Sequence, residues 1–424
     1  MPEEKITESL KVADVWAGHP VGFALLTHGN RQFVAFYDAK RHMTVAQRRL
    51  GSETWTLTKL PSQVGWDSHN YVTLAVDGEG FLHLSGNMHV VPLVYFRSTK
   101  PLDASSLVPV KAMTGQRETR VTYPLFFRGA KQELIFTYRD GGSGNGDQLY
   151  NTYNLKTKAW RRLLDKVLTD GEGERNAYLA LPQLGPDGYF HLIWIWRETP
   201  DAATNHHPSY ARSRDLVHWE DSAGKPLTLP ITLKTGEVID PIPEHGGALN
   251  GQVKLGFDSQ KRPVVSYTKY DKNGKSQLYC SRREKSGWKI YQVSSWDWRW
   301  EFGGGGTIVV EVNVGAVESA GPGHLKLAFR TKNHGSGVLV LDEKTLKVIK
   351  TLPPPEGYPK SLRPVRLKFP ELQVKWASDL GKPAAAGTRY ALRWETLGPN
   401  RDKPRTEPLP PASELWLYKL KEPS

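Results

Sequence analysis

Short apolar strands recur along the whole chain and alternate with polar turns rich in Gly, Asp, Asn and Pro. Helical periodicity is nearly absent, so the pattern predicts an all-β fold. One unit returns: a strand, a tight turn, a second apolar strand, and often a third strand with a Trp nearby. The second strands of seven such units are expected at residues 33–38, 81–87, 133–139, 189–197, 263–269, 325–332 and 389–396.

The spacing of these units indicates a β-propeller. Successive second strands begin 48, 52, 56, 74, 62 and 64 residues apart, which leaves room for about four strands in each unit. We therefore predict a seven-bladed β-propeller that forms a single domain over residues 1–424. The last strand, at 413–420, is expected to pair with strands formed near the N-terminus, because such pairing removes exposed sheet edges.

Two neighbouring hairpins of this pattern begin and end on polar residues. His69 and His89 bracket DSHNYVTLAVDGEGFLHLSGNMH, and Tyr123 and Arg139 bracket YPLFFRGAKQELIFTYR. Antiparallel strands return to the side they left, so each pair sits at one end of its hairpin. Taken singly, each residue is more often structural. Taken together, they form a candidate acid/base set with a cationic anion-binding group.

In such a fold the strand ends that carry these pairs lie at one face and the hairpin turns lie at the other. This geometry places two further histidines. His28 lies in the first hairpin turn and belongs to the opposite face, where a turn histidine is usually just solvated. His19 precedes the first strand and belongs to the same face as His69. A second site on the far face, around His28, therefore stays open.

The charge of the chain indicates which class of ligand the face that carries His69 would bind. The net charge is +13, which attracts polyanions. Lys and Arg are scattered without a basic helix or run, which argues against a nucleic-acid-binding domain. Second strands mostly end on basic residues, and if these converge they form a cationic mouth for an acidic ligand. The candidate substrate-binding residues are Asn70, Arg197, Lys269, Arg299 and Arg330.

Each basic residue also has a simpler interpretation. Each could form an ion pair with a nearby carboxylate of the protein instead of binding a ligand. The adjacent candidates for such pairing are Asp140, Glu198 and Asp271. Arg299 differs, because it lies in WDWRWEFGGGG, whose three Trp residues suit stacking on sugar rings or, alternatively, blade packing.

Other classes of protein are disfavoured. No stretch approaches 18 apolar residues, so no membrane span is expected. The N-terminus lacks a signal-peptide pattern, so the protein is expected in the cytoplasm, or in the periplasm or medium if an export signal was removed. Cys280 is the single cysteine, which excludes internal disulfides and thiolate clusters. The adjacent His206 and His207 do not share a coordination direction, so we expect no metal there. A monomer is expected.

Several segments resemble the BNR-4 repeat proteins over about residues 12–350. They are GHPVGFALL, DSHNYVTLAVDGEGFLHLSGNMH, VTYPLFF, YRDGGSGNGD and WDWRWEFGGGG. This family includes ulvan lyases, rhamnosyl-glucuronate lyases and a group of α-L-rhamnosidases. The resemblance implies a seven-bladed propeller. It also implies, as ligand, an acidic polysaccharide that contains rhamnose and glucuronic acid, such as ulvan or the arabinogalactan of gum arabic.

The resemblance also implies roles for individual residues. The two histidines of the lyases match His69 and His89, their tyrosine and arginine match Tyr123 and Arg139, and Arg197 matches a further carbohydrate-binding arginine. The rhamnosidases use a histidine on the opposite face, and His28 lies at the matching turn. Some ulvan lyases hold a structural metal partly by cysteine in the loop that corresponds to 205–210. Here that loop reads NHHPSY and departs from the pattern.

Three functions follow, with the lyase favoured because all four matching residues are present. In β-elimination, Arg139 offsets the uronate carboxylate, His69 accepts the C5 proton, and Tyr123 donates to the departing O4. His89 orients the base or binds the carboxylate, and the roles of His69 and Tyr123 are interchangeable. This chemistry requires no metal or organic cofactor. The alternatives are an α-L-rhamnosidase centred on His28 and a non-catalytic propeller that binds acidic glycans.

Overall fold

The computed structural model describes residues 3–354, 357–381 and 386–422. Within them the chain forms β-strands and no α-helix, so the all-β prediction is confirmed. Three short 3₁₀ helices lie at Ala104–Ser106, Ala202–Thr204 and Lys360–Leu362. The chain forms two compact units. Unit 1 holds residues 1–140, 150–162 and 356–424, and unit 2 holds residues 141–149 and 163–355.

Unit 1 contains three four-stranded antiparallel sheets. In pairing order the first is β2 (Ala24–His28), β3 (Arg31–Tyr37), β4 (His42–Arg49) and β5 (Thr56–Gln63). The second is β6 (Val72–Val76), β7 (Leu82–Gly86), β9 (Tyr95–Ser98) and β10 (Leu107–Pro109). The third is β29 (Leu372–Ser378), β30 (Thr388–Leu397), β31 (Ser413–Lys421) and β1 (Lys5–Val15).

Five further strands pair with one another; the first of them lies between β7 and β9 in the chain, and the other four follow β10. They pair in the order β8 (His89–Val91), β11 (Val121–Arg128), β12 (Leu134–Gly142), β13 (Asn145–Asn154) and β14 (Ala159–Arg162). The short strand β8 pairs with the beginning of β11. This extra strand brings the end of the first functional hairpin to the start of the second.

Unit 2 repeats the same arrangement. One group of paired strands is β15 (Asn176–Leu179), β17 (Phe190–Arg197), β18 (Asn205–Ser213) and β19 (Trp219–Glu220), with β16 (Gln183–Leu184) on β17 and β20 (Glu237–Val238) on β18. A four-stranded sheet follows, with β21 (Lys254–Phe257), β22 (Pro263–Tyr270), β23 (Ser276–Glu284) and β24 (Gly287–Gln292). Another has β25 (Val312–Ser319), β26 (His324–Thr331), β27 (Ser336–Asp342) and β28 (Val348–Leu352).

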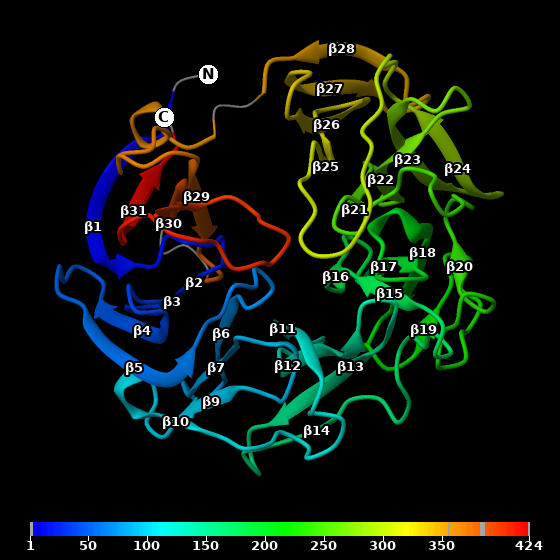
Figure 1. Cartoon of the computed structure of the whole chain (residues 1–424). Coiled ribbons are helices and arrows are strands. Elements are labelled where there is room, and N and C mark those ends of the chain that lie inside the picture. The colour runs from blue at the N-terminus through cyan, green and yellow to red at the C-terminus, as the bar shows by residue number, and fades with distance from the viewer. Residues whose placement is uncertain (1–2, 355–356, 382–385, 423–424) are drawn as a thin grey trace. The chain divides into compact units, whose positions relative to one another are not determined.

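All seven expected second strands are present, as β3, β7, β12, β17, β22, β26 and β30. The predicted pairing of the two chain ends is also confirmed. β1 runs antiparallel to β31, with Leu10 opposite Leu417, and the blue and red strands lie side by side in Figure 1. Successive sheets of about four antiparallel strands are those of a propeller-type fold. The number of seven blades and the single domain stay predictions.

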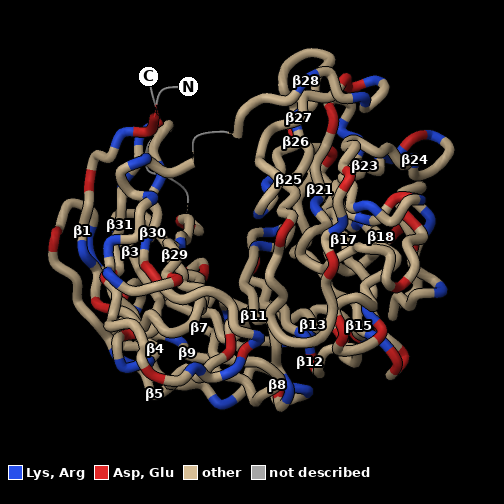
Figure 2. Tube along the Cα trace, turned by 45° about the horizontal axis from the view of Figure 1, so that its top comes forward, with Lys and Arg blue, Asp and Glu red and all other residues tan. Residues whose placement is uncertain are grey.

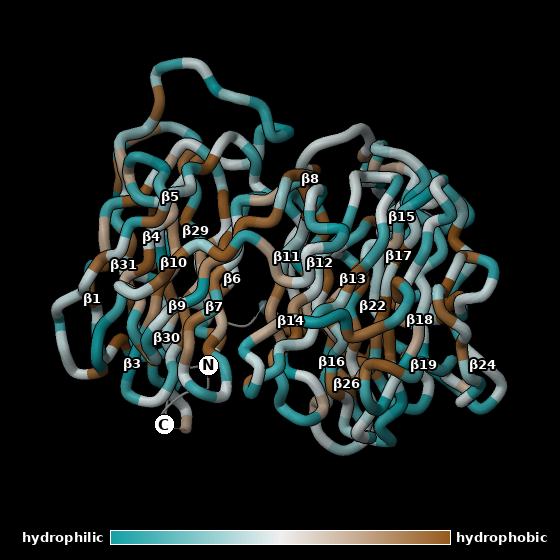
Figure 3. Tube along the Cα trace, turned by 90° about the horizontal axis from the view of Figure 1, so that it is seen from below, coloured by the Kyte–Doolittle hydropathy of each residue, from teal (hydrophilic) through white to brown (hydrophobic). Residues whose placement is uncertain are grey.

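Burial explains why the second strands read as continuous apolar runs. Residues 32–37 of β3 are all buried, whereas the outer strand β5 is mostly exposed. An inner strand packs on both faces against neighbouring sheets, so both sets of alternating side chains are apolar. In unit 1 this packing forms one core that includes Leu25, Phe36, Leu84 and Leu392. Figure 3 shows hydrophobic positions along the strands of both units.

Candidate active site

The pairing of three strands in unit 1 brings the predicted residues together. Thr122 of β11 lies opposite His89 of β8 on one side and opposite Arg139 of β12 on the other. Tyr123 follows Thr122 directly, and His69 lies in the segment that leads into β6. The register therefore places both bracketing pairs at one end of the strands, as the hairpin pattern predicts.

The four side chains form one contiguous cluster. The rings of His69 and His89 stack with centroids 4.2 Å apart and an interplanar angle of 28°. The ring of Tyr123 lies 5.6 Å from that of His69. The guanidinium carbon of Arg139 lies 4.8 Å from the centre of the Tyr123 ring, within the range of a cation–π contact. Arg139 is buried, with 2% of its surface exposed.

Asp67 joins the two histidines, and the sequence analysis did not identify it. One of its carboxylate oxygens lies 2.6 Å from Nδ1 of His69, and the other lies 2.5 Å from Nδ1 of His89. Partial burial would raise the Asp67 pKa, but hydrogen bonds with both histidines outweigh it and hold the pKa well below its usual range. The carboxylate is therefore ionised and accepts at both Nδ1 atoms, which leaves each Nε2 as an acceptor when the ring is neutral.

A second carboxylate, Asp402, supports the first from a distant part of the chain. Its oxygens lie 3.5 Å from Nδ1 of His69 and 3.4 Å from Nε2 of His19. The Ser68 backbone N–H and hydroxyl donate to it at 3.0 and 2.8 Å. His19 and His69 thus share one face, as expected. Asp402 and the preceding Arg401 both have positive φ, 57° and 52°, an unfavourable conformation for these residues that tertiary contacts must stabilise.

Tyr123 also has an unusual backbone. Its φ is +56°, and the pairing of β11 with β12 is irregular between Thr122 and Leu125. Such a bulge redirects a side chain out of the regular alternation, and strained residues of this kind collect at functional sites at a cost of about 1–3 kcal/mol. The Thr122 hydroxyl accepts a bond of 2.7 Å from the Val90 backbone, which ties the bulge to β8.

Asn70 is the one predicted substrate-binding residue in unit 1. Its backbone N–H donates to the Asp67 carbonyl at 3.2 Å, and its own carbonyl accepts from the Tyr37 hydroxyl at 2.6 Å. Its side-chain oxygen is buried and has no hydrogen-bond partner among the described residues. Asn70 therefore fixes the turn that carries His69, and its role toward substrate stays a prediction.

The other predicted binding residues lie in unit 2. Arg197 is buried and donates to the carbonyls of Thr199 and Pro200, and Arg330 is exposed. Lys269 binds Asp240 at 2.6 Å, and Arg299 binds Glu301 at 2.5 Å. Their convergence into a cationic mouth stays a prediction. Figure 2 shows Lys and Arg spread along the chain rather than gathered in one run.

Two of the carboxylates that follow these basic residues in the chain pair with other groups. Asp140 pairs with Arg117 at 2.6 Å, not with Arg139. Glu198 pairs with Arg175 at 2.8 Å and with His206 at 2.6 Å. Consecutive residues of a strand point to opposite faces, so a basic residue rarely reaches the carboxylate that follows it.

His28 lies at the end of β2, exposed in the hairpin turn as expected. The segment 205–210, expected as a loop, belongs instead to strand β18, and the Nδ1 atoms of its His206 and His207 lie 2.6 Å apart. Among the described residues, the group whose ligand atoms could hold a metal ion is Asp67, His69 and His89, all within 4.8 Å of one another. The short N···O distances in this group are those of charge-assisted hydrogen bonds, so the arrangement as it stands suits shared protons.

Asp402→Asn is expected to lower the free energy of unfolding at pH 7 by about 1–2 kcal/mol, because it removes charged hydrogen bonds. Burial would raise the Asp402 pKa, but bonds from His19 and Ser68 and the nearby His69 hold it well below its usual range. A carboxyl group whose pKa is lowered on folding stabilises fully above its unfolded pKa of about 3.9 and loses this effect as the pH falls below it.

The difference between wild type and Asp402→Asn should therefore shrink as the pH is lowered from about 4, toward the folded pKa. Urea unfolding between neutral and acidic pH measures it. A deficit that stays constant down to the lowest pH at which the protein folds would contradict the role of the charged carboxylate.

The comparisons with known proteins agree with this fold. The family model for BNR repeat-containing proteins matches residues 31–296, more than half of the chain. The protein therefore belongs to the BNR repeat-containing family, and the resemblance seen in the sequence motifs is confirmed. A search of curated proteins finds no match. Among the described residues, no helix is long and apolar enough to cross a membrane.

Solved structures with the same fold include polysaccharide lyases. The chain is 13% identical to the polysaccharide lyase Uly1, with a TM-score of 0.66, and the match covers 98% of this chain and 99% of that one. It is 12% identical to a PL25 ulvan lyase, with a TM-score of 0.61 and coverage of 96% and 95%. A structure of a PL25 ulvan lyase bound to -[GlcA(1-4)Rha3S]- matches with a TM-score of 0.60 at 12% identity, with coverage of 96% and 95%.

Proposed function

We propose that this protein is a polysaccharide lyase that cleaves rhamnose–glucuronic acid linkages by β-elimination. The observation that carries the proposal is the carboxylate of Asp67 shared by two stacked histidines, with Tyr123 and Arg139 beside them. This group combines a proton acceptor, a proton donor and a fixed cation, which are the parts that elimination next to a carboxylate needs. The fold shared with polysaccharide lyases supports the same assignment.

His69 acts as the base in this mechanism. Asp67 accepts at Nδ1, so neutral His69 presents Nε2 as an acceptor for the C5 proton. The electrons of the C5–H bond form the C4=C5 double bond, and the C4–O4 bond breaks. Tyr123 donates its proton to the departing O4. The exchange of roles between His69 and Tyr123 gives the same products.

His89 and Asp67 keep the base in place. The imidazole of His89 stacks on His69 at 4.2 Å and binds the other oxygen of Asp67, so the two rings and the carboxylate hold one another in orientation. A fixed orientation contributes to rate because it removes the need to reorganise during proton transfer.

Arg139 supplies the positive charge. Its guanidinium lies 4.8 Å from the centre of the Tyr123 ring, and the residue is 2% exposed. Because the guanidinium is buried, its field is less screened than that of a surface cation. The electrostatic stabilisation by Arg139 therefore grows as negative charge builds on the carboxylate toward the enolate-like transition state.

One assay tests the proposal and its alternatives. The protein is incubated with ulvan and with gum arabic, and both the ultraviolet absorbance of unsaturated uronate and free rhamnose are measured. We expect absorbance to rise, and an exo-acting lyase would release rhamnose as well. Rhamnose without absorbance would indicate hydrolysis, with His28 as the candidate catalytic residue. Neither signal, together with binding to the polymers, would indicate a non-catalytic glycan-binding protein.

We also propose that the enzyme works as a monomer outside the cytoplasm, in the periplasm or the medium. The support is the size of the polysaccharide substrate, which does not cross a membrane intact. The proposed chemistry involves this chain's own side chains and calls for no metal or organic cofactor.

A further inference from the structure

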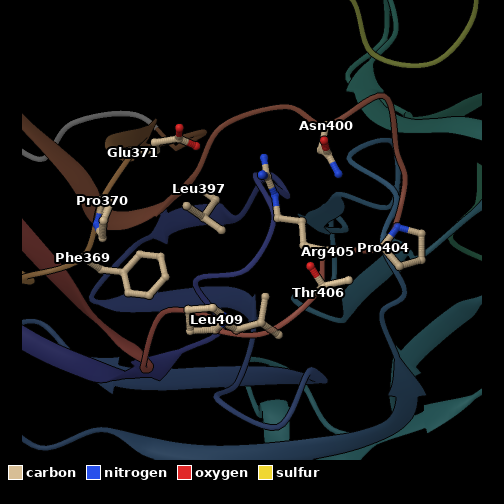
Figure 4. A pocket seen from close by; sticks show the side chains of 10 residues that line it. Phe369, Pro370, Glu371, Leu397, Asn400, Pro404, Arg405, Thr406 and Leu409 are labelled. Carbon is tan, nitrogen blue, oxygen red and sulfur yellow. The ribbon is translucent and has the colours of Figure 1, made fainter.

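A pocket of about 440 Å³ lies in unit 1, between the segment that precedes β29 and the loop that joins β30 to β31 (Figure 4). Its walls are mostly apolar and include Phe369, Leu397 and Leu409, while Asn400 and Arg405 contribute polar groups. Both the volume and the mixture of apolar walls with few polar groups are typical of small-ligand sites, which span roughly 300–1,000 Å³.

Arg405 is the group in this pocket that suits an anion. Its Nη2 donates to the Gly398 carbonyl at 2.9 Å, which fixes the direction of the side chain. Its Nε is buried and has no hydrogen-bond partner among the described residues. Figure 4 shows the guanidinium between Leu397 and Asn400. A guanidinium held in this way is prepared to bind a carboxylate or sulfate through its planar set of donors.

The loop that carries Arg405 is predominantly basic in sequence. The segment NRDKPR at 400–405 carries three basic residues and the single acidic residue Asp402. Asp402 binds His19 and Ser68 and does not line the pocket. Glu371 also lines the pocket, so Arg405 and Glu371 are its one basic and one acidic lining residue.

The same loop connects the pocket to the catalytic cluster. Asp402, whose carboxylate lies 3.5 Å from Nδ1 of His69, is three residues from Arg405. Three residues span at most roughly 10 Å even when fully extended. The pocket therefore lies within a few sugar units of the proposed base.

We propose that this pocket is a subsite for a sugar unit that flanks the cleaved linkage of an acidic polysaccharide. Phe369 and Leu409 pack against the apolar face of the sugar ring, and Arg405 binds its anionic substituent, a carboxylate or an ester sulfate. The proposal rests on the proposed function and adds a residue that sets affinity for the polymer rather than the rate of the chemical step.

The test compares Arg405→Ala with Lys403→Ala, a matched loss of one cation from the same loop at a position that does not line the pocket. KM and kcat are measured on ulvan, on desulfated ulvan and on the shortest oligosaccharide that is cleaved. We expect Arg405→Ala to raise KM on ulvan about tenfold, the effect of one charged hydrogen bond, with kcat little changed. On the shortest oligosaccharide the effect should vanish, because that substrate does not reach the pocket.

The substrates identify the anion. If desulfated ulvan abolishes the effect of Arg405→Ala, the bound group is a sulfate, and if the effect persists it is a carboxylate. Equal increases in KM for Arg405→Ala and Lys403→Ala would overturn the proposal, since they would indicate general attraction by charge. A fall in kcat at constant KM would also overturn it, because Arg405 would then act through the loop.

A second variant guards against a folding defect. Thr406 is exposed and lines the pocket, so Thr406→Trp should fill the pocket without removing a charge, and it should raise KM as Arg405→Ala does.

If wild type shows no elimination, the proposed function fails, and the pocket is tested by retardation in a gel that contains ulvan. Loss of retardation in Arg405→Ala and Thr406→Trp but not in Lys403→Ala would support the subsite, and equal retardation of all variants would refute it.

Discussion

Arg139→Ala is expected to abolish elimination, with kcat/KM on ulvan or gum arabic reduced at least about a thousandfold. The uronate carboxylate makes the C5 proton acidic only when its own negative charge is offset. Arg139 is the buried cation of the cluster, 4.8 Å from the Tyr123 ring, and burial leaves its charge less screened than it would be at the surface. The absorbance of unsaturated uronate measures the loss.

Two controls separate chemistry from folding. Arg139→Ala leaves a cavity, so Arg139→Met, which fills much of the volume without the charge, should be equally inactive and should unfold close to the wild-type temperature. Arg212→Ala removes another cation–tyrosine contact, at 4.3 Å from Tyr189 in unit 2, and should keep full activity. If Arg139→Ala formed unsaturated uronate at the wild-type rate, the assignment of the cation would be wrong.

Asp67→Asn is expected to reduce kcat by about 10²–10⁴-fold with a much smaller change in KM. An amide cannot accept hydrogen bonds from both Nδ1 atoms, because its nitrogen is a donor. At least one histidine would then present the wrong tautomer, and the loss of a carboxylate that orients a catalytic histidine has an effect of about this size in another enzyme class. Steady-state kinetics on ulvan provide the measurement.

The matched control for this prediction is Asp215→Asn. Asp215 binds Nδ1 of His218 at 2.7 Å in an exposed part of unit 2, so the same type of contact is removed away from the cluster. It should leave kcat unchanged. An unaffected kcat in Asp67→Asn would show that neither histidine depends on the shared carboxylate, and the proposed base would have to be reassigned.

Much of the fold and part of the candidate site could be predicted because the signals are local. Alternation and turn residues place β3, β7 and β30, and the two bracketing pairs identify His69, His89, Tyr123 and Arg139. Asp67 lies two residues before His69 in the same motif, so the segment DSH contains a signal that a search for histidine partners would have found. The expected partners of Arg139 and Arg197 were wrong because neighbouring strand residues face opposite ways.

The sequence by itself determined the strands, the pairing of the chain ends and the residue types of the cluster, because periodicity and turn chemistry act over a few residues. Only the tertiary structure decided that one carboxylate serves both histidines and that Asp402, 334 residues from Ser68, lies beside His69. It also decided that the Arg139 guanidinium contacts the Tyr123 ring and that Arg405 lines a pocket. These contacts depend on how separate sheets and loops pack, and no local pattern encodes the packing of residues so far apart in the chain.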